Sequence, residues 1–267
     1  MVKVIAHRGA RSIAPENTLM AAEIAFKTGA GLWETDVNTT LDGHLILFHD
    51  KSLLRCTNAA SKFPSRASYN VKDFSIREIM QLDAGSYFID TDPFLQIFKG
   101  NISKERLASF KKAFIPTLEQ GLLFTKKMNW KINLELKRFC QADNDTYIPD
   151  KTLEIIRGSG LPLNRVAISS FYHEWLYRVM KKEPEIEVQA LVGENDTDHP
   201  PEFGDYAFPT YNINACLVDS DMIKRLKARG RKINLYTVND PKEFSHFANL
   251  GVDGMFTDFP QLFSAKI

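Results

Sequence analysis

Two histidines and three acidic residues of this sequence have the types and positions that phosphoryl chemistry needs. His7 and His49 each follow an apolar run, Glu34 and Asp36 stand two residues apart, and Glu135 lies further along the chain. Because the unperturbed pKa of histidine is about 6.5, one imidazole can accept and another can donate a proton near neutrality. Carboxylate oxygens are the ligands that hard divalent cations such as Mg²⁺ and Ca²⁺ prefer. These residues together predict metal-assisted cleavage with a histidine acid–base pair.

The spacing of the acidic residues predicts that they converge on one ligand. Residues i and i+2 of a strand point to the same side, so Glu34 and Asp36 form one pair. Glu135 and Lys137 form another. Three inward carboxylates would repel one another and resist desolvation unless a cation compensates them. The alternative is a metal-free cluster in which the first pair binds Arg8 and Lys137. We expect the metal site, with these two cations neutralising a bound phosphate.

The elements that must position these residues are short apolar runs alternating with segments of helical periodicity. Such alternation is typical of βαβ units, and eight units close a (β/α)8 TIM barrel. The predicted strands are Lys3 to His7, Leu32 to Val37, Lys131 to Lys137, Arg165 to Ser169, Glu187 to Val192, Ala215 to Val218, Lys232 to Val238 and Gly254 to Thr257. Since the C-terminal ends of parallel barrel strands meet at one face, the separated polar residues form one site there.

Capping signals predict where several helices begin. A helix over Thr18 to Lys27 is stopped by the glycines that follow it. Thr117 and Gln120 form a capping box, and Pro241 after Asp240 opens another helix. Glu119, the weaker rival of Glu135 as a metal ligand, would then lie in the first turn of a helix, where the helix dipole favours it.

Two segments depart from the alternation. Leu41 to Asp50 has Asp42-Gly43 at its turn, which predicts a hairpin extension of the second strand that carries His49 over the mouth. The stretch of approximately 51–115 is too long for a structureless connection, so we predict a cap or insertion within a single domain of residues 1–267. Within it, Asn101 to Phe114 is basic and partly amphipathic, as in a solvated surface helix, with membrane docking as the alternative.

Composition excludes several classes of function. Hydrophobic residues make up 44% and charged residues 25%, which is ordinary for a globular protein with a large core. The 34 Lys and Arg balance 33 Asp and Glu, so a net charge of +1 provides no general field for nucleic acid. A small-molecule anion recognised locally is the expected partner, whereas the oligomeric state stays undetermined.

Cysteine usage and hydropathy bear on the compartment. Cys56, Cys140 and Cys216 are odd in number and lack metal-ligand spacing, which indicates reduced thiols. No apolar run approaches the ~20 residues of a transmembrane helix, and the first predicted strand leaves no room for a signal peptide. These features favour the cytoplasm.

The order and spacing of seven motifs closely resemble the glycerophosphodiester phosphodiesterase family, nearly end to end. No single motif is specific, because a lone His-Arg-Gly or Glu-Leu-Lys arises by chance. The motifs are His7-Arg8-Gly9, Pro15-Glu16-Asn17-Thr18, Glu34-Thr35-Asp36-Val37, His49-Asp50, Ile115-Pro116-Thr117-Leu118-Glu119, Glu135-Leu136-Lys137 and Thr257-Asp258-Phe259-Pro260.

The resemblance implies a barrel that hydrolyses glycerophosphodiesters to sn-glycerol 3-phosphate and an alcohol, with Mg²⁺ or Ca²⁺. It also implies attack by a glycerol hydroxyl of the substrate, which gives a cyclic phosphate that water then opens. The matching residues are His7 and His49 as acid–base pair, Glu34, Asp36 and Glu135 as metal ligands, and Arg8 and Lys137 as phosphate contacts. Which histidine donates, which metal binds and which alcohol leaves all stay open.

Neighbouring residues have expected supporting roles. Asp50 is expected to orient His49, and Glu16 and Asn17 to hydrogen-bond the loop that carries Arg8. Phe171 is a candidate pocket wall.

The sequence also departs from the family pattern. Tyr236 is a second candidate for the pocket wall and stands where the family often has tryptophan. The stretches from Asn58 to Asn70 and from Asp90 to Phe114 look longer than the family's short forms, which affects access to the mouth. Two alternative functions are a phospholipase D-like activity on lysophospholipids, whose related branch has aspartate in place of Glu135, and phosphodiester binding without hydrolysis.

Overall fold

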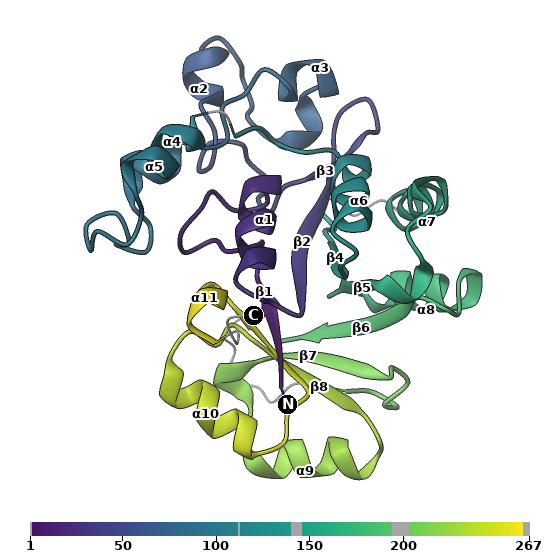
Figure 1. Ribbon diagram of the computed structural model, residues 1–267. Helices are drawn as coiled ribbons and strands as arrows, with labels where there is room; N and C mark the ends of the chain where they lie inside the picture. Colours follow the sequence, from purple (N-terminus) through teal and green to yellow (C-terminus); the bar gives the residue numbers. More distant parts are fainter. Residues whose placement is uncertain (1, 112, 140–145, 194–202, 264–267) are drawn as a thin grey trace.

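Eight parallel strands close into a barrel that helices surround (Figure 1). The computed structural model describes residues 2–111, 113–139, 146–193 and 203–263. The strands are β1 (Lys3–Ala6), β2 (Leu32–Thr39), β3 (Leu45–Leu47), β4 (Ile132–Leu136), β5 (Val166–Ser170), β6 (Glu187–Val192), β7 (Thr210–Asn214), β8 (Lys232–Tyr236) and β9 (Gly254–Thr257). Pairing of β1 with both β9 and β2 closes the barrel, and β3 adds an antiparallel edge to β2. The predicted (β/α)8 architecture is therefore confirmed.

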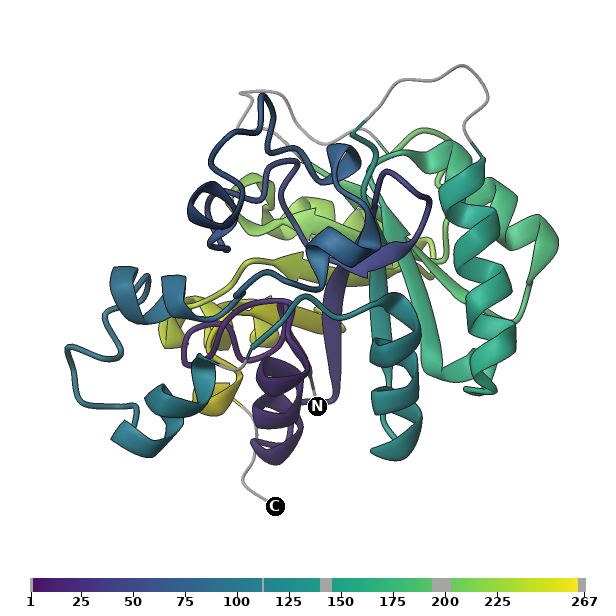
Figure 2. The same cartoon turned by 90° about the horizontal axis from the view of Figure 1, so that it is seen from above.

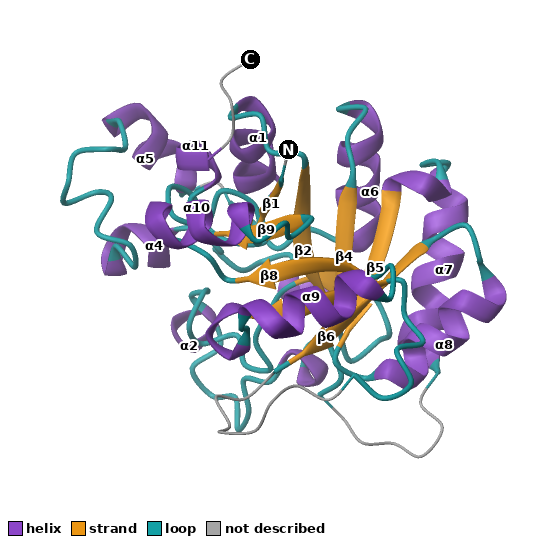
Figure 3. Ribbon diagram, turned by 90° about the horizontal axis from the view of Figure 1, so that it is seen from below, coloured by secondary structure: helices purple, strands orange, loops and turns teal. Residues whose placement is uncertain are grey.

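Helices cover the outside of the barrel, as Figure 3 shows in a view turned by 90° from that of Figure 1. They are α1 (Leu19–Lys27), α2 (Ala59–Lys62), α3 (Ile76–Ile79), α4 (Ser86–Thr91), α5 (Lys104–Phe110), α6 (Leu118–Lys127), α7 (Tyr147–Ser159), α8 (His173–Lys182), α9 (Ser220–Ala228), α10 (Pro241–Asn249) and α11 (Pro260–Phe263), with short 3₁₀ turns η1 (Val71–Asp73), η2 (Leu163–Arg165) and η3 (Ala215–Leu217). The predicted caps are present: Thr117 and Gln120 form the capping box of α6, and Asp240 accepts hydrogen bonds at the start of α10.

Most predicted strands agree with the structure to within two residues, but the strand over Ala215 to Val218 is wrong. That segment is mainly the 3₁₀ turn η3, and the barrel strand is β7 just before it. The sequence pattern did not reveal β7, because polar residues of this strand face the barrel interior where an apolar run was expected. Asn212, for example, faces the interior and is fully buried. The Asn214 side chain accepts a hydrogen bond from the Cys216 amide, which turns the chain away from the sheet.

A layer of amides fills the barrel interior beneath the mouth. The Gln189 side-chain oxygen accepts hydrogen bonds from Asn133 at 2.8 Å and from Asn212 at 3.0 Å. Asn234 donates to the Asn212 oxygen at 2.9 Å, and Ser169 donates to Asn133 at 2.8 Å. Because each buried amide finds a partner, the interior can be polar without the cost of unpaired groups.

The predicted hairpin is present, and the long segment after it packs on its far side. Val37 of β2 faces Leu47 of β3 in antiparallel register, and His49 comes two residues after Leu47. The segment of 51–115 has its own apolar cluster, in which Leu53 and Phe74 are fully buried. In Figure 2 the short helices of this segment lie along one side of the barrel and over part of its upper end.

The predicted surface helix of residues 101–114 is shorter in the structure, where α5 covers only Lys104–Phe110. Phe110 anchors it against Phe88, at 5.4 Å between ring centroids. Among the residues that the structure describes, no helix has the length and hydropathy to span a bilayer. Cys56 is a buried free thiol whose pKa burial raises to about 12, Cys216 is an exposed free thiol, and Cys140 lies outside the described residues.

Candidate active site

A left-handed turn after β1 places His7 and Arg8 at the C-terminal mouth. Arg8 has φ +53° and Gly9 has φ +82°. A Cβ on Gly9 would lie 2.6 Å from the Ala21 carbonyl carbon in α1, so only glycine fits this close approach. The turn directs the Arg8 backbone N–H to Glu34 Oε2 at 2.9 Å. Unusual backbone geometry at this position therefore serves to bring the chain onto the carboxylates.

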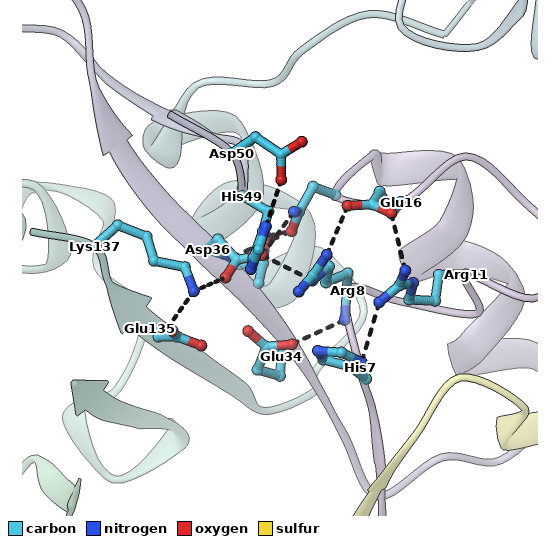
Figure 4. Close-up of polar contacts among 12 residues, drawn as sticks. His7, Arg8, Arg11, Glu16, Glu34, Asp36, His49, Asp50, Glu135 and Lys137 are labelled. Carbon is cyan, nitrogen blue, oxygen red and sulfur yellow. Dashed lines mark hydrogen bonds and ion pairs between the residues drawn. The ribbon is translucent and has the colours of Figure 1, made fainter. Parts of the chain in front are cut away.

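The three predicted metal ligands converge at this mouth (Figure 4). One carboxylate oxygen from each of Glu34, Asp36 and Glu135 lies within 4.8 Å of the others. Register explains the convergence, because Asp36 of β2 is paired with Glu135 of β4, and Glu34 points to the same side two residues earlier. Glu119, in contrast, is exposed in the first turn of α6.

The negative charges of Asp36 and Glu34 are compensated by nearby cationic side chains to very different degrees. Asp36 lies 3.2 Å from Arg8 Nε and 3.0 Å from Lys137 Nζ, and Lys137 also pairs with Glu135. Burial opposes ionisation of Asp36, yet Lys137 and Arg8 hold its pKa well below the usual range. Burial, followed by the charges of Asp36 and Glu135, instead raises the pKa of Glu34 well above its usual value.

The residues present fit a hard divalent cation. Within the described part of the chain, Glu34 Oε1 is buried and has no hydrogen-bond partner. The metal-free alternative explains Asp36 but leaves this oxygen uncompensated. A buried, unpaired carboxylate oxygen beside two further carboxylates, with no nitrogen or sulfur ligand in the cluster, suits Mg²⁺ or Ca²⁺ better than zinc.

His7 is held by an aspartate from the opposite end of the chain. Its Nδ1 lies 2.7 Å from Asp258 Oδ1, and Asn239 donates to the other oxygen of Asp258 at 2.8 Å. Burial, and then the positive charge of Arg8, lowers the pKa of His7 to about 4. His7 is therefore neutral near pH 7, with Nδ1–H donated to Asp258 and Nε2 left as an acceptor.

His49 is held by its neighbour in sequence. Its Nδ1 lies 2.6 Å from Asp50 Oδ1, and Arg55 donates to Asp50 Oδ2 at 2.6 Å. Although burial opposes it, the hydrogen bonds from His49 and Arg55 lower the pKa of Asp50 to about 2. The expected orienting contact of Asp50 is thus present.

Glu16 and Asn17 brace the site from the loop after β1. The buried carboxylate of Glu16 binds Arg8 at 2.8 Å, Arg55 at 2.8 Å and Arg11 at 3.3 Å. Asn17 donates to Asp36 Oδ2 at 2.8 Å. The Asn17 backbone N–H donates to the Arg8 carbonyl at 3.1 Å, so both residues contact the loop that carries Arg8, as expected.

Sequence reasoning assigned no role to Asp258, Asn239, Arg11 or Arg55. Asp258 directly follows the last strand, where polar side chains of a barrel gather, so its position alone could have pointed to it. Arg55 lies in irregular sequence, and no pattern in the sequence signals its contacts.

Two cavities meet at the mouth. The inner cavity, about 320 Å³, is lined by His7, Arg8, Glu34, His49, Glu135, Lys137, Ser169, Phe171, Leu191, Tyr236, Thr237 and Phe256. The outer cavity, about 480 Å³, is lined by His49, Asp50, Lys51, Glu135, Leu136, Lys137, Arg138, Phe139, Ser170, Phe171 and Tyr172. The two share His49, Glu135, Lys137 and Phe171, which places a histidine, a carboxylate and a cation at their junction.

Comparison with known proteins agrees with this geometry. Residues 7–262 match the model of the glycerophosphoryl diester phosphodiesterase family. The chain belongs to this family. A glycerophosphodiester phosphodiesterase of Bacillus altitudinis is 34% identical over 97% of this chain and 96% of its own length. A mouse glycerophosphoinositol inositolphosphodiesterase is 33% identical over 97% of this chain, which spans 46% of that longer protein.

Solved structures of the family share the fold. An Oleispira antarctica phosphodiesterase, determined in complex with the product sn-glycerol-3-phosphate, superposes with a TM-score of 0.78 at 25% identity, covering 97% of this chain and 94% of that one. A glycerophosphodiester phosphodiesterase from Agrobacterium tumefaciens gives a TM-score of 0.73 at 26% identity over 99% of both chains.

Proposed function

We propose that this protein hydrolyses glycerophosphodiesters to sn-glycerol 3-phosphate and an alcohol at the C-terminal mouth of the barrel. The observation that carries the proposal is the mouth of the barrel, where a carboxylate triad lies beside two histidines, each with an aspartate on Nδ1. A phosphodiester is the substrate that needs both charge neutralisation and two proton transfers. Family membership supports the same reaction.

Glu34, Asp36 and Glu135 would hold the divalent cation, Mg²⁺ or Ca²⁺. When bound, it supplies Lewis acidity and positive charge to the phosphoryl oxygens. Lys137 lies at the junction of the cavities and Arg8 lines the inner one, so both would contact the phosphate. Their ion pairs with Asp36 hold these two side chains in place before substrate arrives.

The two histidines would take different proton transfers. His7 lines only the inner cavity and is neutral, so it would accept the proton of a glycerol hydroxyl as that oxygen attacks phosphorus. His49 lines both cavities and would donate a proton to the departing alcohol oxygen as its bond to phosphorus breaks, which leaves a cyclic phosphate. Water then opens the ring: His49 takes the water proton, and His7 returns its proton to the glycerol oxygen.

Phe171 and Tyr236 would form the apolar wall for the glycerol carbons. Their rings meet edge to face at 6.2 Å in the inner cavity, and the Tyr236 hydroxyl donates to the Val192 carbonyl at 2.8 Å. We also propose that residues 1–267 act as one catalytic domain in the cytoplasm, with the 51–115 segment at the rim and no nucleic-acid partner.

Release of glycerol 3-phosphate from glycerophosphocholine and glycerophosphoglycerol tests the function. Wild type is assayed with EDTA and then with added Mg²⁺ or Ca²⁺, beside Glu34→Gln. We expect product only from wild type with metal. Turnover of lysophosphatidylcholine alone would favour the phospholipase D-like reaction, and binding without turnover of any diester would favour a non-catalytic barrel.

A further inference from the structure

The outer cavity has a chemistry of its own. Beyond the junction with the inner cavity, its wall contains Lys51 and Arg138 together with Phe139 and Tyr172. If the glycerol moiety occupies the inner cavity, the outer one is where the second alcohol of the diester must lie. The composition of its wall then decides which alcohols bind well.

The acidic groups of this wall are already neutralised. Asp50 is bound by His49 and Arg55, and Glu135 pairs with Lys137 and belongs to the carboxylate triad. Lys51 and Arg138, in contrast, form no ion pair with any residue that the structure describes. The unneutralised charge in the outer cavity is therefore positive.

One face of the Tyr172 ring in this wall is already covered. The Arg138 guanidinium carbon lies 3.9 Å from the centre of the Tyr172 ring, which fixes the side chain by a cation–π contact. A quaternary ammonium such as choline is recognised by free aromatic faces. At Tyr172 it would meet a guanidinium instead of a ring face.

Arg138 also has unused hydrogen-bonding capacity. Its Nε is buried and has no hydrogen-bond partner within the described ranges of the chain. The planar, permanently charged guanidinium matches the geometry of phosphate oxygens, and stacking on Tyr172 pre-organises it for that contact.

Resting on the proposed function, we propose that the outer cavity binds the leaving alcohol and selects alcohols that carry a further phosphate, with Arg138 as the selecting residue. The preferred substrate class is a glycerophosphodiester of a phosphorylated polyol. Glycerophosphocholine, whose alcohol is cationic, is the disfavoured class.

A matched set of substrates isolates this selectivity. Glycerophosphoglycerol and the same compound with a phosphate on its distal glycerol differ by one group, and glycerophosphocholine provides the cationic case. We expect wild-type kcat/KM, with metal, to be about tenfold or more higher for the phosphorylated compound than for glycerophosphocholine. Raising the salt concentration should narrow this ratio, because Lys51 is exposed.

Variants of two stacked arginines provide the control. Arg138→Gln should bring the ratio close to one, whereas Arg138→Lys should keep much of it because the charge stays. Arg229, stacked on Tyr206 at 4.4 Å, has a similar arrangement outside both cavities, so Arg229→Gln should leave the ratio unchanged.

The possible results distinguish a failure of this inference from a failure of the proposed hydrolase function. Equal or better turnover of glycerophosphocholine by wild type would overturn the selectivity and leave the hydrolase activity intact. A preference that persists in Arg138→Gln would overturn the role of Arg138. Absence of turnover of all three compounds with either metal would overturn the proposed function itself.

Discussion

The two histidines of this mouth have the same partner chemistry but very different settings. His7 is supported by Asp258, 251 positions away in sequence, and its side chain is 15% exposed. His49 is supported by Asp50, the next residue, and its side chain is 32% exposed. The first pair depends on barrel closure between β1 and β9, and the second on a short segment after the hairpin.

In the proposed mechanism, this difference in setting separates the roles of the two side chains. The buried setting of His7 lowers its pKa to about 4, so it is prepared to accept a proton throughout the neutral range. His49 lies where the two cavities join, which is where the proposed mechanism places the leaving alcohol. In the proposed mechanism, similar aspartate contacts therefore support a base inside the barrel and an acid at its rim.

The largest expected effect comes from replacing the histidines and varying the leaving group. His7→Gln should lower kcat/KM by roughly 10²–10⁴-fold for both an alkyl diester and a nitrophenyl diester of glycerol phosphate, because both need the attacking hydroxyl deprotonated. His49→Gln should have a similar effect on the alkyl diester only, because nitrophenolate leaves without a proton. Equal losses for the two substrates in His49→Gln would contradict the assignment.

Replacing each of the two supporting aspartates should lower kcat, and the two losses should differ by about an order of magnitude. Asp258→Asn should lower kcat by roughly 100-fold, because the amide can donate to Nδ1 and favour the wrong His7 tautomer. Asp50→Asn should lower it by about tenfold, since water can replace the contact at the more exposed His49. Metal affinity measured by calorimetry serves as the control. A smaller loss for Asp258→Asn than for Asp50→Asn would reverse the comparison.

Burial of His7 also predicts a pH dependence of stability. The pKa falls from 6.5 in the unfolded chain to about 4 in the fold, so only the unfolded chain takes up a proton in this window. Neutral His7 makes its full contribution to the free energy of unfolding above pH 6.5. At most about 3 kcal/mol of that free energy is lost as the pH falls to 4.

The His7→Gln variant should not show this loss of stability between pH 6.5 and 4. Urea unfolding of the metal-free protein at several pH values measures it. Asp258, whose pKa is lowered to about 2 by the His7 hydrogen bond despite burial, titrates below the window. Parallel stability curves for wild type and His7→Gln would show that His7 is not held neutral.

The smallest expected effect on kcat comes from replacing Arg55, which binds the aspartate that supports His49. Arg55 pairs with Asp50 and Glu16, but its side chain is 45% exposed, so Arg55→Gln should reduce kcat only about threefold. Arg157→Gln, which breaks an exposed pair with Glu183 away from both cavities, is the matched control and should leave kcat unchanged. A loss as large as that of Asp50→Asn would make Arg55 an essential part of the site.

The sequence by itself determined the barrel and the principal residues of the mouth. Alternating apolar runs, capping signals and a two-residue carboxylate period are local patterns, and each is set by backbone geometry within a few residues. They sufficed to place Glu34, Asp36 and Glu135 together, and they failed at β7, where polar residues face inward to join the buried amide layer around Asn212.

Only the tertiary structure decided how those residues are compensated. It placed Asp258 on His7, paired Asp36 rather than Glu34 with Arg8 and Lys137, and covered the Tyr172 ring with Arg138. Such contacts join residues that are distant in sequence, and their energies depend on burial and on every nearby charge. No local pattern contains that information, because burial and distance exist only once the barrel has closed.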